Sequence, residues 1–198
     1  AAAEDLERGT GGRGAIGSGS STDTGYLKYT KATAERAAAI GYMARATSAD
    51  ALAIGSGANA WGGGSTAVGA SAVASANHAS AFGDNAKANA DYATALGANA
   101  SASRSYSIAI GSADAAEDSA IAIGNGAQVT GSKSVAVGLN AQATKGDSSA
   151  YGNTARARGE SSSAYGTYAT ASGKSSSAYG HLAGARGESS SAYGNEAS

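Results

Sequence analysis

The stretch SVAVGLNAQATKGD (residues 134–147) is one unit of a repeat that runs through most of the chain. Two apolar residues flank an alanine, Gly138 and two variable residues follow, and alternating alanines lead into a polar turn. The next unit, SSAYGNTARARGE (residues 148–160), follows the same pattern. Its glycine recurs at a step of 14 residues ten times out of eleven, with one step of 13 between Gly111 and Gly124. We interpret the short step as the loss of one residue from a turn, and the fixed period as the signature of a solenoid.

Each unit holds two short segments with period-2 alternation, which predicts two β-strands per coil, of about five residues each once the turns are subtracted. Stacking such coils at about 4.8 Å predicts an all-β fold, a parallel β-roll (solenoid) of 14-residue repeats. We assign residues 37–198 to this solenoid as a single domain. Residues 1–36 are predicted to be an irregular N-terminal cap: Ala15-Ile16-Gly17 starts a degenerate coil, Ser18–Arg36 contains an insertion, and Tyr26 and Tyr29 cover the open end.

The composition excludes a conventional globular core. The 198 residues include 52 Ala and 30 Gly, but Val, Ile, Leu and Phe together number only 19. The net charge of −1 gives no reason to expect nucleic acid or an anionic membrane as a partner, and no apolar run is long enough to insert into a membrane. Without cysteine, neither disulfides nor thiolate metal sites are available.

Alternation along the first strand of each coil places a small alanine inside the roll and the larger residue beside it outside. This leaves a continuous apolar column on the surface, and burying a Val, Leu or Ile side chain contributes roughly 1.5–3 kcal/mol. We therefore predict a homotrimer in which three columns form a shared core. The column consists of Ile40, Ile54, Val68, Phe82, Leu96, Ile110, Ile123, Val137, Tyr151, Tyr165, Tyr179 and Tyr193. Each is followed by a turn glycine: Gly41, Gly55, Gly69, Gly83, Gly97, Gly111, Gly124, Gly138, Gly152, Gly166, Gly180 and Gly194.

The second strand of each coil presents polar residues on the opposite outer face, which we expect to meet solvent or a ligand. The candidate ligand face consists of Arg45, Trp61, Lys87, Arg156, Arg158 and Arg186. Trp61 is the only tryptophan, an aromatic type enriched in binding hot spots, although a ring lying over Gly-rich turns is the simpler interpretation. The five basic residues of this face form a sparse basic stripe. The simpler interpretation is that the stripe is only solvated, and the alternative is that it recognises an acidic ligand. In the turns, Glu160, Lys174 and Glu188 are expected to form a charge ladder along successive coils.

The motifs SIAIGSAD, AIAIGNGAQ and SVAVGLNAQAT resemble the repeats in the heads of YadA-like trimeric autotransporter adhesins, over about residues 37–198. The resemblance implies a left-handed roll and a homotrimeric head on a coiled-coil stalk at the outer membrane of a Gram-negative bacterium. It also implies attachment to host extracellular-matrix proteins or host cells, and some family members are haemagglutinins. The chain differs in using Tyr at the column position of the last four coils and Ser in place of the first apolar residue of those coils, at Ser149, Ser163, Ser177 and Ser191. It shows no neck, stalk or barrel, so we expect a fragment of a longer chain.

The sequence offers little support for catalysis, a cofactor or a metal site. His78 and His181 occupy unlike repeat positions. His181 beside Tyr179 is the least improbable catalyst, by analogy with hexapeptide solenoid acyltransferases, but the six-residue period is missing. Calcium-binding solenoids need Asp at a fixed place, whereas the aspartates here fall at different places in the coils. The threonines are too irregular for an ice-binding ladder.

Two functions remain open on sequence grounds. One is a surface adhesin head that binds host matrix or cells through many weak contacts on the lateral face of a trimer. The other is a structural spacer that displays a more distal binding domain. The sequence leaves open the ligand and whether the tyrosine-rich coils bind or only pack.

Overall fold

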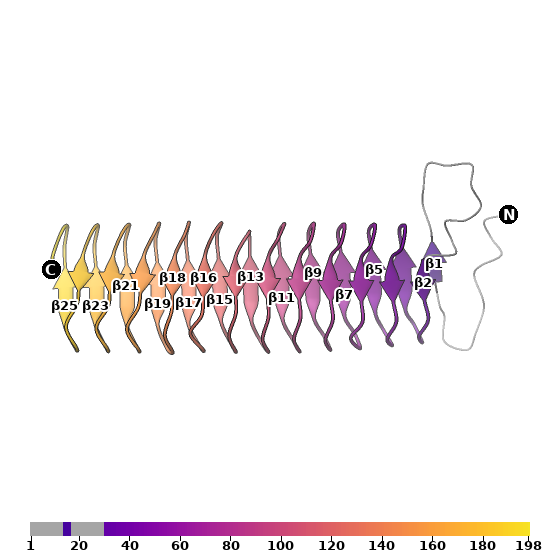
Figure 1. Ribbon diagram of the computed structural model, residues 1–198, viewed down its shortest axis with the longest axis horizontal. Coiled ribbons are helices and arrows are strands. Elements are labelled where there is room, and N and C mark those ends of the chain that lie inside the picture. The colour runs from indigo at the N-terminus through magenta and orange to yellow at the C-terminus, as the bar shows by residue number, and fades with distance from the viewer. Residues whose placement is uncertain (1–13, 17–29) are drawn as a thin grey trace. The chain divides into compact units, whose positions relative to one another are not determined.

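The computed structural model describes residues 14–16 and 30–198, and the chain divides into two compact units, Ala1–Ala100 and Ser101–Ser198. Each unit is a parallel β-solenoid, and no helix occurs among the described residues. Every full coil contributes a three-residue strand to one sheet and a two-residue strand to the other. Within each unit, the strands of successive coils lie side by side (Figure 1). The parallel roll predicted from the period is therefore confirmed.

In the first unit, one sheet contains β1 (Gly14–Ile16), β3 (Ala38–Ile40), β5 (Leu52–Ile54), β7 (Thr66–Val68), β9 (Ser80–Phe82) and β11 (Thr94–Leu96). The other contains β2 (Lys31–Ala32), β4 (Arg45–Ala46), β6 (Asn59–Ala60), β8 (Val73–Ala74) and β10 (Lys87–Ala88). Strands pair in parallel register, one coil with the next. Ile16 pairs with Ile40, and Ile40 with Ile54.

In the second unit, one sheet contains β13 (Ile108–Ile110), β15 (Ile121–Ile123), β17 (Val135–Val137), β19 (Ser149–Tyr151), β21 (Ser163–Tyr165), β23 (Ser177–Tyr179) and β25 (Ser191–Tyr193). The other contains β12 (Ser101–Ala102), β14 (Asp114–Ala115), β16 (Gln128–Val129), β18 (Gln142–Ala143), β20 (Arg156–Ala157), β22 (Thr170–Ala171) and β24 (Gly184–Ala185). We refer to the two sheets of a unit as its odd and even sheets.

The strands are shorter than the five residues expected from the sequence, because the turns take up more of each coil than expected. Each regular coil has two tight turns, and the third residue of each turn has a positive φ, as at Met43 (φ 58°) and Asp50 (φ 59°). The backbone amides of the turns bond to carbonyls of the preceding coil, for example Asp50 N to Glu35 O at 3.0 Å. The backbone groups of the turns are therefore also paired between coils.

The interior of each roll is made almost entirely of alanine. The central alanine of each odd strand, such as Ala53 or Ala136, is 0% exposed, and so are paired alanines of the second strand such as Ala58 and Ala60. Only one larger side chain, Val129, is fully buried in the described part of the chain, apart from serines. Small side chains suit this narrow interior, and the inward alanines predicted by the alternation are confirmed.

The one 13-residue step removes a residue from the turn after β13. Gly111 leads through Ser112 and Ala113 directly into β14, whereas other coils have one more residue there. The φ of Gly111 is 85°, against 120° to 136° at its equivalents in the other coils. The strands on both sides keep their register, with Ile110 paired to Ile123 and Ser101 to Asp114. The loss of one turn residue is confirmed and leaves the stacking intact.

The range 1–36 that the sequence assigned to a cap includes β1, β2 and the residues outside the described part. β1 and β2 pair with β3 and β4, so parts of this range already follow the coil geometry. Tyr26 and Tyr29 lie outside the described residues. The domain boundary at residue 37 stays a prediction.

Candidate functional site

The apolar column lies on the outer face of each odd sheet. Its members are half-buried or exposed in the single chain, since the central alanine between the two flanking positions points inward. Exposure reaches 39% at Phe82 and 46% at Leu96 in the first unit, and 67% at Tyr193 in the second. Leu52, Ile108 and Val135, which start their strands, widen the strip and are half-buried. The sheet thus presents an apolar surface; its role as a trimer core stays a prediction.

At nine of the twelve column positions, among them Ile54 and Tyr165, the glycine that follows is required by the closeness of the coils. Gly55 has a φ of 129°, and a Cβ built on it would lie 2.4 Å from the carbonyl oxygen of Gly69. Gly166, with a φ of 134°, would bring its Cβ to 2.3 Å from the oxygen of Gly180. Both the backbone angle and the missing space exclude a side chain there. These glycines fix where the column residues sit, one above another.

Four tyrosines form a continuous stack at the C-terminal end of the column. The ring centroids of Tyr151 and Tyr165 are 4.8 Å apart, those of Tyr165 and Tyr179 4.9 Å, and those of Tyr179 and Tyr193 5.1 Å. The planes lie within 11° of parallel. Burial, followed by the neighbouring tyrosines, raises the pKa of Tyr165, while a hydrogen bond with Ser149 opposes the shift. The stack is a flat strip that carries hydroxyl groups along its edge.

The candidate ligand face follows the even sheets. In the first unit, Arg45 and Lys87 begin β4 and β10, and both are exposed. Asn59 and Val73 lie between them in register. Trp61, which follows β6, is 46% exposed, and its carbonyl accepts a hydrogen bond from the hydroxyl of Ser48. Two coils therefore lie between the two cations, and Trp61 follows a strand of the same sheet as a single exposed ring.

In the second unit the same face carries Arg156, Arg158 and Arg186. Arg156 begins β20 and is half-buried, whereas Arg158 and Arg186 are exposed. None of the three forms an ion pair with a described residue. The Nε atom of Arg156 is buried without a hydrogen-bond partner. The structure thus groups these three arginines over neighbouring coils; their role in ligand binding stays a prediction.

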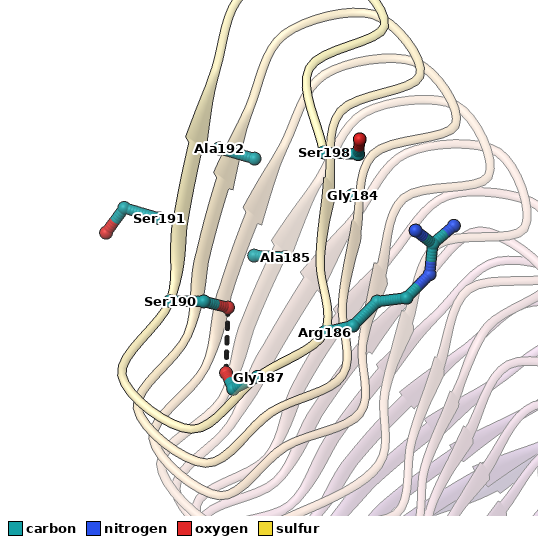
Figure 2. Close-up of a pocket in the computed structure, with 8 residues that line it drawn as sticks. All are labelled: Gly184, Ala185, Arg186, Gly187, Ser190, Ser191, Ala192 and Ser198. Carbon is teal, nitrogen blue, oxygen red and sulfur yellow. Dashed lines mark hydrogen bonds between the residues drawn. The ribbon is translucent and has the colours of Figure 1, made fainter.

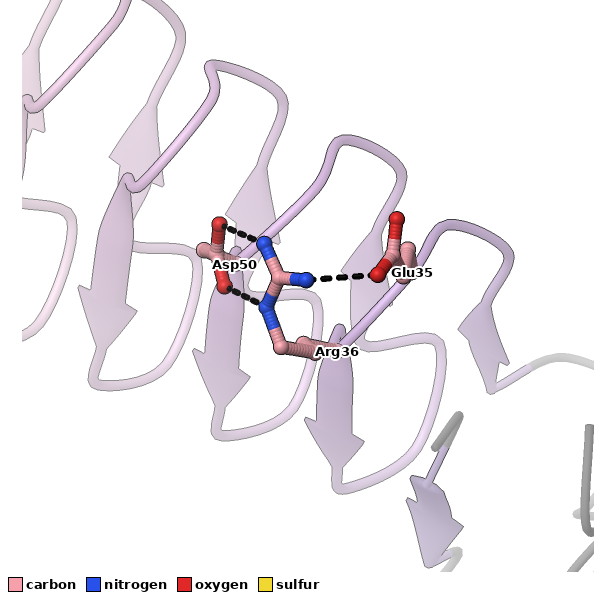
Figure 3. Close-up of polar contacts among 3 residues, drawn as sticks. All are labelled: Glu35, Arg36 and Asp50. Atoms are coloured by element: carbon pink, nitrogen blue, oxygen red, sulfur yellow. Dashed lines mark hydrogen bonds and ion pairs between the residues drawn. The ribbon is translucent and has the colours of Figure 1, made fainter. Parts of the chain in front are cut away.

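The turns hold the ion pairs of the described residues. Lys174 Nζ lies 3.5 Å from Glu160 Oε2 on the neighbouring coil, as the charge ladder predicted. Glu188, on the next coil, forms no ion pair with the described residues. The predicted ladder is therefore reduced to the single pair of Lys174 and Glu160. A second cluster was not predicted: Arg36 contacts Asp50 at 2.5 Å and 2.7 Å and Glu35 at 2.5 Å (Figure 3).

Neither histidine has a catalytic setting. His78 stacks on Tyr92 with ring centroids 5.1 Å apart, and His181 Nδ1 lies 3.0 Å from Asn195 Oδ1. Over residues 14–16 and 30–198, no group of three or more His, Cys, Asp or Glu could hold a metal ion. Nor does that part of the chain contain a helix long and apolar enough to cross a membrane.

A cavity of about 280 Å³ lies at the last coil and exposes the interior of the roll. Ala185 and Ala192 point into it, Ser190 donates a hydrogen bond to the carbonyl of Gly187 at 2.7 Å, and Arg186 points away (Figure 2). Apart from Arg186, the residues that line it are glycine, alanine and serine.

The sequence analysis did not predict that a set of serines is buried at one corner of the coils. They occupy the corner four residues before the turn glycine, where the sequence shows either Ser or Ala. Ser162 donates a hydrogen bond to the carbonyl of Gly159 at 2.7 Å, and Ser148 to that of Lys145 at 2.6 Å. The sequence did contain a signal for this burial, because the position is occupied only by Ala or Ser, whose side chains are small enough for the interior.

Comparison with known proteins gives one result that agrees with this geometry. The sequence model of the YadA head domain repeat matches residues 32–58, 60–86, 74–100, 88–113 and 115–141. These matches cover more than half of the chain. No curated protein matches it. Since the matched segments follow the same 14-residue coils that build the two units, the chain belongs to the family of YadA head domain repeats.

Proposed function

We propose that the chain forms the head of a homotrimeric adhesin on the surface of a Gram-negative bacterium, with its anchor outside this chain. Membership of the YadA head family supports an adhesin-type function. The single observation that carries the trimer is the half-exposed apolar column of the odd sheets, since so long an apolar strip is unusual on a soluble monomer. Three left-handed rolls placed side by side bury these columns against one another.

The even sheets then face outward and meet the host. Their side chains are charged, hydroxyl or amide groups with few large apolar residues, a composition suited to many weak contacts rather than to one deep pocket. Three copies of such a face bind an extended or repetitive target with avidity. The proposed targets are extracellular-matrix proteins such as collagen, fibronectin or laminin, or a host cell surface, where binding to erythrocytes would appear as haemagglutination.

The assembly is tested by light scattering after size exclusion at several dilutions. A stable mass of about three times the 18.8 kDa of one chain is expected. A folded monomer at all concentrations would contradict the proposal, because the column would then be stable in water on its own.

Adhesion is tested by surface plasmon resonance of the chain on immobilised collagen, fibronectin and laminin, and by attachment to host cells. Saturable binding to one of these surfaces is expected. A correctly assembled trimer that binds none of them would instead favour the alternative function of a spacer for a more distal binding domain.

A further inference from the structure

Three arginines of the second unit keep their hydrogen-bond donors available. Arg156, Arg158 and Arg186 have no ion-pair partner among the described residues, and the buried Nε of Arg156 lacks a hydrogen-bond partner. A guanidinium presents five donors in a planar fork that matches oxyanions in a bidentate manner. The buried Nε of Arg156 is out of reach of a ligand, so the donors that can bind an acceptor from outside the chain are the Nη groups of Arg156 and the guanidinium groups of the exposed Arg158 and Arg186.

The register aligns two of the arginines along the roll. Arg156 pairs with Thr170, and Thr170 with Gly184. A Cβ on Gly184 would lie 3.7 Å from Cζ and Nη2 of Arg186, so the Arg186 guanidinium extends over this glycine. It thus lies in the row that Arg156 begins, two coils further on, or about 9.6 Å at the usual strand spacing.

The same face carries no carboxylate from β16 to β24. Acidic groups of these coils, Asp147, Glu160 and Glu188, lie in the turns. We call the outward surface of β16 to β24 the arginine face; besides its three arginines it presents Gln128, Thr130, Gln142, Thr144, Thr170 and Ser172. It is thus a flat strip with positive charge, surrounded by hydroxyl and amide groups. The charge is segregated by face, although the whole chain has a net charge of −1.

We propose that the arginine face binds a linear sulfated polysaccharide. Guanidinium groups pair with the sulfates and uronic carboxylates, and the hydroxyl and amide side chains bond to the sugar hydroxyls. Two guanidinium groups two coils apart along the roll suit a polymer whose charges also repeat. The face has no aromatic side chain, so it offers no platform for stacking the bases of a single-stranded nucleic acid. The inference deepens the proposed adhesin function and rests on it.

The test compares the wild-type chain with R156Q/R158Q/R186Q. The matched control, R104Q/K133Q/K145Q, makes the same change in charge at three exposed turn residues of the same unit. Calorimetry with heparin is expected to show binding by the wild type that weakens with salt and disappears when desulfated heparin is used. The affinity should fall at least about tenfold in the first variant and stay within about twofold in the control.

Other outcomes separate the explanations. Equal losses in both variants would mean attraction by total charge and would overturn the site. Tighter binding to oligo(dT) or to anionic vesicles than to heparin would overturn the sulfated polysaccharide as the ligand. Binding of the wild type to matrix proteins is measured in parallel: matrix binding by the wild type without heparin binding refutes this inference alone, whereas heparin binding without matrix binding or cell attachment refutes the proposed adhesion to those targets.

Discussion

At the scale of single residues, the turn glycines set the distance between coils. The Cβ of an alanine at position 166 would meet the carbonyl oxygen of Gly180 at 2.3 Å, at a φ of 134° that disfavours any L side chain. We expect Gly166→Ala to lower the free energy of unfolding by about 2–4 kcal/mol, because clash and backbone strain add. Urea unfolding followed by circular dichroism at fixed protein concentration measures the loss.

Gly194→Ala is the matched control for this prediction. Gly194 has a similar φ of 122°, but a Cβ there has no heavy atom within 4 Å. Gly194→Ala should therefore introduce backbone strain without a clash, and its loss in the free energy of unfolding should be clearly smaller. Equal losses at positions 166 and 194 would mean that the close approach of the coils contributes nothing.

Asp50 provides a pH-dependent contact at the same scale. The hydrogen bond from Arg36 lowers the pKa of this carboxyl, helped by the charge of Arg36, while desolvation opposes the shift. A lowered pKa in the folded state means that the contribution is present above the unfolded pKa, near 3.8, and is lost as pH falls through the folded value. NMR titration should place the Asp50 carboxyl below its ordinary pKa, and Arg36→Gln should return it. An unchanged titration in the variant would contradict this coupling.

At the scale of elements, the tyrosine stack gives β19, β21, β23 and β25 a different response to alkali from that of the aliphatic strands. Burial and the adjacent Tyr151 and Tyr179 raise the pKa of Tyr165. A raised folded pKa stabilises the fold below the unfolded pKa of about 10, and this contribution is lost as pH rises through the folded value. The melting temperature should therefore fall above pH 10, and Tyr165→Phe should reduce the fall.

The control is Tyr168→Phe, which removes a hydroxyl from a turn outside the stack. It should leave the alkaline fall in place. If both variants reduce it equally, the pH dependence belongs to tyrosine ionisation in general and not to the stack.

How far sequence predicts these elements depends on whether a feature repeats. The parallel pairing, the inward alanines and the shortened turn before β14 were predictable, since each follows from period and alternation. The strand lengths were not, because the turn residues with positive φ include side chains as different as Met43, Asn85 and Asp50, which carry no common signal. The Arg36 contact with Asp50 and the unpaired Nε of Arg156 depend on side-chain conformations that do not recur along the repeat. The repeating geometry of the coil could thus be predicted from the sequence, whereas the individual side-chain contacts could not.

At the scale of the whole molecule, the proposed trimer predicts that a charge in the apolar column breaks assembly without unfolding the roll. Ile123 pairs with Ile110 and Val137 on the two adjacent strands and is half-buried in the single chain. A carboxylate there remains in water in a monomer but is buried in a trimer, at a cost of several kcal/mol for each chain. We expect Ile123→Asp to give a folded monomer by light scattering and circular dichroism.

Asn125→Asp adds the same charge two residues away on an exposed turn and should remain trimeric. The pair of variants also connects assembly with adhesion. If the lateral faces act by avidity, the monomer should lose apparent affinity for immobilised matrix or cells by about a hundredfold or more, while the turn variant binds like the wild type. A monomer that binds as tightly as the trimer would show that one chain carries the whole site, and adhesion would then owe nothing to the three-fold repetition of the face.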